Sequence, residues 1–246
     1  MAGTVFLKEL QPQGSRTEVP EQPSVSPAIR WMQQCRRFNY HKLLPKAPTP
    51  MAFMANSNNV EVYNSVISNG DDCISIGSGS FNVIGSLGQK KTSACVGNVT
   101  VRNSVVKHSD NGVRIKTWQG GQGSASGVIF DGIQMDTVRN PIIIDQYYCL
   151  SKPCANLSSA VNISNVLYSN INGTYDDRRP PIHLGCSEAV PCTNIALSNV
   201  KLLPRREDAL DAFCWNAYGE MRTASVPPIS CLLEGMPRSI PGYKGG

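Results

Sequence analysis

A loose repeat of alternating apolar and polar residues runs along the chain from residue 59 onward. Each unit alternates for about six positions and then reaches an Asn, Asp or Gly turn, which predicts a short strand with one buried face. Successive units begin 29 to 39 residues apart. The units are Asn59–Ser65, Asn98–Ser104, Gly127–Ile133, Ala160–Val166 and Asn194–Val200.

A second short strand is predicted after three of the units, at Cys73–Ile76, Gly112–Lys116 and Pro141–Asp145. Such strands cannot bury an apolar face alone, whereas stacked coils can, and like residues in successive coils would then form ladders. We therefore expect an all-β chain folded as a parallel β-helix. An antiparallel sandwich also uses many short strands and is the competing architecture.

Residues 1 to about 50 break this pattern, because prolines recur there and prevent regular elements. We expect an irregular N-terminal segment over residues 1–55, with N-terminal coils missing or rearranged, and a β-helix domain over residues 56–246. The start of the chain lacks the basic and apolar regions of a secretory signal.

Composition narrows the possible partners. The net charge of the 246 residues is +5, but Lys and Arg are scattered rather than concentrated in the basic stripe of a nucleic-acid binder. No apolar stretch is long enough to span a bilayer. We therefore expect neither nucleic acid nor membrane as a partner.

The nine cysteines and the glycosylation sequons indicate an oxidising compartment, and so a secreted protein. Several cysteines are closely spaced, and none has the neighbours of a metal site, so we expect no metal bound by them. The sequons begin at Asn98, Asn156, Asn162 and Asn172.

Two adjacent carboxylates, Asp71 and Asp72, stand between Gly70 and a predicted strand. Glycoside hydrolysis needs one carboxylic acid to protonate the leaving oxygen and one carboxylate to activate water. Repulsion between two close carboxylates raises one pKa and can keep that group protonated. Taken alone, the pair is more typical of an ordinary turn.

Two further motifs are weak when each is considered alone. Arg114 and Lys116 are two residues apart on a predicted strand, so they project from one face and suit a substrate bearing carboxylates, although an edge strand can carry the same charges. Tyr147 and Tyr148 follow the strand that ends at Asp145 and could stack on a sugar ring or pack internally.

Together, in this order and spacing, the three motifs resemble those of the polygalacturonase family, glycoside hydrolases of pectin. The resemblance covers roughly residues 56–235. It rests on Gly-Asp-Asp-Cys-Ile-Ser-Ile-Gly from Gly70, Arg-Ile-Lys from Arg114 and Ile-Gly-Ser-Leu-Gly from Ile84. The Phe213–Glu220 stretch and the loop between Cys186 and Cys192 are similar to plant-type members.

The resemblance implies a right-handed parallel β-helix whose cleft binds polygalacturonate. It also implies that the protein is a monomer, needs no cofactor and is secreted to the cell wall. It implies that Asp71 is the general acid and that Asp72 helps to position and deprotonate the attacking water, with inversion at the anomeric carbon. Arg114 and Lys116 would bind galacturonate carboxylates, and Tyr148 would line the cleft.

Among the possible disulfides, we rank Cys186 with Cys192 and Cys214 with Cys231 as the best pairs, ahead of Cys149 with Cys154.

The chain departs from the family pattern at two places. The family carries an Asn-Thr-Asp-Gly motif one coil before the acidic pair, but no Asp occurs between Met1 and Gly70. It also carries a Gly-His-Gly motif ahead of Ile84, where this chain runs directly on from Gly79-Ser-Phe-Asn-Val. None of His41, His108 and His183 replaces that histidine. The missing half coil would also shift the register of the stack.

Three functional interpretations follow. The first is a polygalacturonase-type hydrolase, with activity severely reduced or absent because an Asp and a His are missing. The second is a non-catalytic pectin-binding β-helix that keeps Arg114, Lys116 and Tyr148. The third is a structural or adhesive solenoid unrelated to carbohydrate, against which the acidic pair and the Arg-Ile-Lys motif argue.

Overall fold

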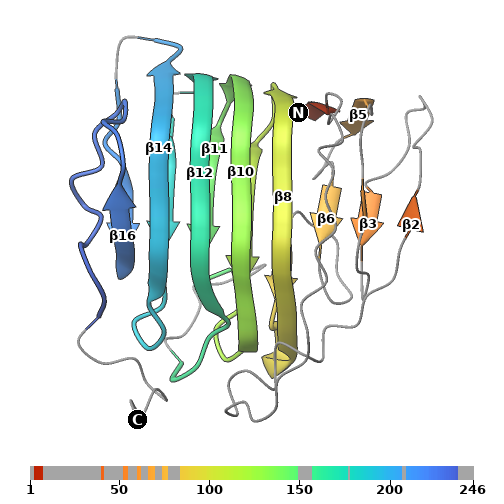
Figure 1. Ribbon diagram of the computed structural model, residues 1–246, viewed down its shortest axis with the longest axis vertical. Helices are drawn as coiled ribbons and strands as arrows, with labels where there is room; N and C mark the ends of the chain where they lie inside the picture. Colours follow the sequence, from red (N-terminus) through yellow and green to blue (C-terminus); the bar gives the residue numbers. More distant parts are fainter. Residues whose placement is uncertain are drawn as a thin grey trace, which may run out of the picture.

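The computed structural model describes residues 84–148, 157–176, 178–206 and 209–237, together with the backbone of six short strands nearer the N-terminus. The chain is built almost entirely of strands (Figure 1). Its one described helical element is a single 3-10 turn, η1 (Gln89–Lys91). Within the described part, no helix is long and apolar enough to cross a membrane.

Most strands belong to two seven-stranded sheets. The long-strand sheet has the order β16 (Ala217–Met221), β14 (Cys192–Pro204), β12 (Asn162–Tyr175), β10 (Gln122–Val138), β8 (Ser93–Lys107), β1 (Gly3–Leu7) and β5 (Val66–Asn69). The short-strand sheet has the order β15 (Phe213–Trp215), β13 (Ile182–Gly185), β11 (Asn140–Asp145), β9 (Asn111–Thr117), β7 (Ile84–Leu87), β6 (Ile74–Ile76) and β3 (Ala52–Met54). A separate pair joins β2 (Tyr40–His41) to β4 (Val60–Glu61).

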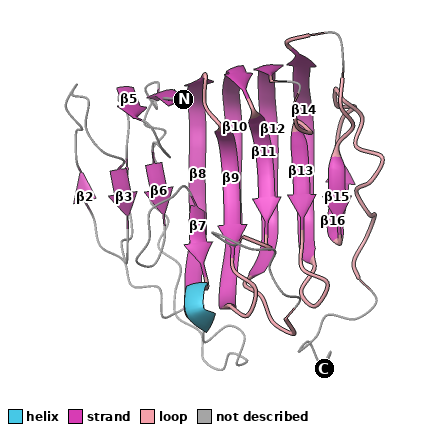
Figure 2. Cartoon of the chain, turned by 180° about the vertical axis from the view of Figure 1, so that it is seen from behind, coloured by secondary structure: helices cyan, strands magenta, loops and turns pink. Residues whose placement is uncertain are grey.

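From β7 to β16 the chain alternates between the two sheets, and each strand pairs in parallel with the strand one coil further on. Figure 2 shows the short-strand sheet in front of the long-strand sheet, with the coils stacked side by side. This is the predicted all-β parallel β-helix, and the parallel pairing excludes the antiparallel sandwich.

The long strands contain two sharp corners at matching positions. Register aligns Asn165 with Asn194 and Asn170 with Asn199, and all four have positive φ of 51–55°. Asn tolerates this left-handed conformation better than most residues. The side chains also form ladders, since Asn194 Nδ2 donates to Asn165 Oδ1 at 2.5 Å and Asn199 Nδ2 donates to Asn170 Oδ1 at 2.8 Å.

In β10, glycines occupy the two corner positions, and one of them is also required by space. Gly132 has φ of 67°, and a Cβ there would lie 2.9 Å from Asn103 Oδ1 in the preceding coil. The Asn and Gly residues that end the sequence units are therefore the corners of the coils. Four of the five predicted units lie on β8, β10, β12 and β14, while the first lies on β4, in the separate pair.

The core lies between the two sheets and consists of apolar ladders along the stack. Val128, Val166 and Ile195 are successive register partners and are all buried. In the next ladder the rings of Phe130 and Tyr168 stack with centroids 5.4 Å apart. Burial raises the pKa of the Tyr168 hydroxyl, which has no hydrogen-bond partner among the described residues.

One strand interrupts the parallel order. Among the described residues β7 follows β6 along the chain, and both belong to the short-strand sheet. In the long-strand sheet, the place between β5 and β8 is occupied by β1, which pairs antiparallel with both neighbours (Figure 1). An N-terminal strand thus separates β5 from β8 in the long-strand sheet. The domain boundary proposed at residue 55 stays a prediction.

Candidate functional site

The site begins on β9, where alternation sends side chains to opposite faces of the short-strand sheet. Val113 and Ile115 are buried in the core. Arg114 and Lys116, at the intervening positions, therefore project from the outer face, as the sequence predicted. Their register partners on β11 are Ile143 and Asp145.

Tyr148 brings the two cationic side chains together. It follows β11, and its backbone N–H donates to the Thr117 carbonyl at 3.2 Å, which holds it beside β9. Its ring centroid lies 4.6 Å from Lys116 Nζ and 5.2 Å from Arg114 Cζ. The Trp118 ring meets the same ring edge-on, with centroids 5.8 Å apart. The predicted substrate-binding residues thus form one cluster.

The environment of the two cations is unlike that of an ordinary surface strand. The Lys116 side chain is 0% exposed, whereas an unpaired lysine on an edge strand would extend into water. With the Asn111 amide oriented to bring Oδ1 toward Arg114, that oxygen accepts a hydrogen bond from Arg114 Nη1 at 3.1 Å. Arg114 Nε is buried without a hydrogen-bond partner among the described residues. A guanidinium can donate hydrogen bonds to an anionic ligand through N–H groups that the protein leaves unpaired.

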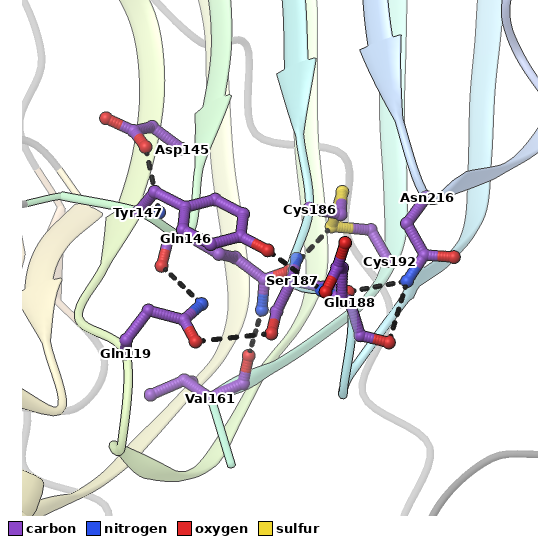
Figure 3. The surroundings of a disulfide bond; sticks show 10 residues. All are labelled: Gln119, Asp145, Gln146, Tyr147, Val161, Cys186, Ser187, Glu188, Cys192 and Asn216. Atoms are coloured by element: carbon purple, nitrogen blue, oxygen red, sulfur yellow. Dashed lines mark hydrogen bonds between the residues drawn. A yellow bond between two sulfur atoms is a disulfide. The ribbon is translucent and has the colours of Figure 1, made fainter. Parts of the chain in front are cut away.

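A buried glutamine holds the turn that carries Tyr148. Gln146 is fully buried; its Nε2 donates to the Val161 carbonyl at 2.7 Å, and its Oε1 accepts from the Ser187 N–H at 2.8 Å. Its backbone carbonyl accepts from Gln119 Nε2 at 3.0 Å. Figure 3 shows these groups converging beside a disulfide. The position of the aromatic turn is therefore fixed from three neighbouring segments.

The disulfide is Cys186–Cys192, as expected, and it closes the loop that follows β13. Within this loop the Glu188 N–H donates to the Tyr147 hydroxyl at 3.0 Å, so the loop also contacts the aromatic turn (Figure 3). The second expected disulfide, Cys214–Cys231, is present as well. Cys149 and Cys154 lie outside the described residues.

One functional candidate was missed in the sequence. His183 lies far from Arg114 in the sequence, but its register partner is Ile143, which in turn pairs with Arg114. His183 therefore belongs to the same outer row as Arg114. Burial lowers the pKa of its imidazole; nearby Asp145 raises it, and Arg179 lowers it further. Only the register of the coils, which the sequence does not show, brings these residues together.

Asp71 and Asp72 lie outside the described residues, so the structure gives no geometry for them. In the chain they stand between β5 and β6, and β6 is separated from β9 in the short-strand sheet by β7 alone. Within the described residues, no group of three or more His, Cys, Asp or Glu could hold a metal ion.

The fold and the cluster together define a parallel β-helix with a cationic and aromatic site on the outer face of one sheet. Sequence comparison identifies the family. The profile of glycosyl hydrolases family 28 matches residues 51–216, more than half of the chain. The chain belongs to glycosyl hydrolase family 28.

Named relatives agree with this assignment. The chain is 39% identical to "Polygalacturonase QRT2" of Arabidopsis thaliana over 80% of this chain and 49% of that protein. It is 40% identical to "Polygalacturonase-2" of Solanum lycopersicum over 70% and 41%, and 46% identical to a "Polygalacturonase" of Persea americana over 58% and 34%. The chain thus spans half or less of the length of these relatives.

Proposed function

We propose that this chain binds the polygalacturonate backbone of pectin and acts on it as an inverting polygalacturonase. The observation that carries the proposal is the cluster of Arg114, Lys116 and Tyr148 on the outer face of the short-strand sheet. Family membership and the polygalacturonases among the relatives support it. The two disulfides support secretion to the cell wall.

The proposed roles rest on the geometry of the cationic cluster and on the family motif. Arg114 and Lys116 would neutralise galacturonate carboxylates, and the Tyr148 ring would contact a sugar face. Asp71 would donate a proton to the glycosidic oxygen as the bond to the anomeric carbon breaks. Asp72 would take a proton from the water that attacks that carbon from the opposite face. These two roles rest on the family motif.

A second candidate, binding without cleavage, is favoured by a specific observation. No Asp occurs between Met1 and Gly70, where the family motif supplies a further carboxylate, and no His stands ahead of Ile84 at the Gly-His-Gly position. A lost acid–base group typically reduces a rate by about 10²–10⁴-fold. The cationic cluster is unaffected by this loss, so binding can persist.

One experiment separates the two. Reducing-end release from polygalacturonate is measured for the purified chain and for Asp71→Asn, and binding to the same polymer is measured for both. Release that disappears in Asp71→Asn supports the hydrolase. Binding by both proteins without release supports the non-catalytic binder.

The cationic cluster has a matched test. Arg114→Gln is expected to weaken polymer binding at least about tenfold, because a charge-assisted hydrogen bond contributes roughly 1.5–3 kcal/mol. Arg102→Gln removes an arginine on the long-strand sheet, where it pairs with Asp131 at 3.8 Å, and serves as the control. Equal binding by the two variants, or no binding by the wild-type chain, would contradict the proposal.

A further inference from the structure

The outer face of the short-strand sheet continues well beyond the cationic cluster, in two parallel rows. One row runs by register from Arg114 through Ile143 and His183 to Phe213. The adjacent row follows the same four strands, from Lys116 through Asp145 and Gly185 to Trp215. Since neighbouring strands lie about 4.8 Å apart, the rows extend about 14 Å from β9 to β15.

The far end of these rows is aromatic and exposed. Phe213 and Trp215 both point outward, because Cys214 between them is turned toward the core. They are 42% and 50% exposed. Large apolar side chains this open, on a strand whose other side packs well, mark a contact surface more often than a structural need.

One position between the charged and aromatic ends of the second row carries no side chain. Gly185 occupies the position between Asp145 and Trp215 and has no side chain. The His183 ring stacks on Phe213 with centroids 4.7 Å apart and planes 21° from parallel, and its Nε2 lies 2.9 Å from where a Gly185 Cβ would be. The imidazole edge is thus presented above the glycine, beside an exposed indole.

We infer that Phe213, Trp215 and His183 form a second sugar-binding subsite. It holds further galacturonate units of the same polygalacturonate molecule that is bound at Arg114 and Lys116. The inference rests on the proposed function. Sugar ring faces are apolar and pack on aromatic rings, while an imidazole nitrogen can hydrogen-bond to a hydroxyl group. One polymer is the occupant that fits both ends, because the two rows run by register from the cationic to the aromatic residues over about 14 Å.

The experiment compares affinity across oligogalacturonides of increasing length, from the disaccharide to the hexasaccharide, for the wild-type chain and for Trp215→Ala. The wild type is expected to gain affinity with length. Trp215→Ala is expected to lose about 2- to 10-fold for the long oligomers and nothing for the disaccharide, as expected for one lost aromatic contact.

Two further variants exclude a general effect of the substitution. Trp215→Phe keeps a ring and is expected to restore most of the length dependence. Leu203→Ala removes an exposed apolar side chain of similar exposure, 43%, from the long-strand sheet and is expected to change nothing. Circular dichroism checks that each variant is folded.

The outcomes distinguish this inference from the proposed function. Wild-type binding that is independent of length, or unchanged in Trp215→Ala, overturns the second subsite and leaves the proposed function standing. No wild-type binding at any length overturns both. A Trp215→Ala chain that changes its oligomeric state in sedimentation, with unchanged affinity, assigns the aromatic pair to a contact between copies and also overturns the subsite.

Discussion

The His183 ring lies directly over Gly185, two residues later on the same strand, with Nε2 2.9 Å from the position of a Gly185 Cβ. Residues two apart on a strand project to the same face. The absence of a side chain at Gly185 therefore leaves room for the His183 ring. The relationship determines where the imidazole edge points on the outer face of the short-strand sheet.

Gly185→Ala should therefore displace the His183 ring. The contacted atom is the end of a side chain that can rotate, so we expect a modest loss of stability, about 1 kcal/mol. The stacking on Phe213 should be disturbed at the same time, which a changed His183 ring chemical shift in NMR would report. An unshifted His183 resonance in the variant would contradict this placement.

Stability should depend on pH through His183. Burial lowers the pKa of the folded imidazole below its usual 6.5, so the unfolded chain binds more protons in the window between the two values. The contribution to stability is complete above pH 6.5 and is lost as the pH falls toward the folded pKa. His183→Gln should remove this part of the pH dependence, measured as the difference in denaturation free energy between the two proteins. Parallel curves for the two proteins would refute it.

Gln146→Leu should destabilise the aromatic turn. The substitution keeps the volume but leaves the Val161 carbonyl and the Ser187 N–H without the partners they now have at 2.7 and 2.8 Å. Unpaired buried groups cost about 1–3 kcal/mol each, so we expect a loss of about 2–4 kcal/mol in chemical denaturation. Gln134→Leu replaces an exposed glutamine on β10 and is the control; an equal loss in both would argue against the network.

The disulfide Cys186–Cys192 should stabilise the folded chain in addition to the Gln146 hydrogen bonds. Replacing Cys186 and Cys192 by serine reopens a short loop and is expected to cost about 2 kcal/mol from chain entropy. The thermal unfolding midpoint under non-reducing conditions measures the effect. Binding of the disaccharide should survive, since neither cysteine belongs to the cationic cluster; a complete loss of binding in a folded variant would show that the loop positions Tyr148 more directly.

Val5→Pro should disrupt the long-strand sheet. Val5 pairs with Ile67 on one side and Val106 on the other, so a proline there interrupts pairing within an interior strand. We expect a loss of more than about 2 kcal/mol and a tendency to aggregate, because β8 would gain an open edge. Val5→Thr keeps the backbone donor and should behave like the wild type in thermal unfolding and light scattering.

Much of the fold could be predicted from local pattern. Alternation ending in Asn or Gly located the coils on β8, β10, β12 and β14, because these residues take the left-handed corners that turn each coil. The short strands β13 and β15 show little alternation, and neither of them is predicted from the sequence. Of the strand predicted over Asn59–Ser65, the structure describes Val60–Glu61, which lies in the separate pair, because propensity does not decide which strand a segment joins.

Only part of the candidate site could likewise be predicted from the sequence. Arg114 and Lys116 could be predicted to share a face because they are two apart on one strand. His183, Phe213 and Trp215 could not be added to them, because their proximity depends on register across coils separated by tens of residues. The catalytic assignment of Asp71 and Asp72 remains a prediction from the family motif.

The antiparallel strand β1 also bears on how the chain reaches its native state. Thr4 pairs with Lys107, whereas β8, β10, β12 and β14 pair with the strands of neighbouring coils. During synthesis β1 emerges first, yet β8 is complete only about a hundred residues later, so the pairing closes a long loop at an entropic cost. The coils from β8 onward can zip together from nearest neighbours, and docking of β1 would then be a separate kinetic phase.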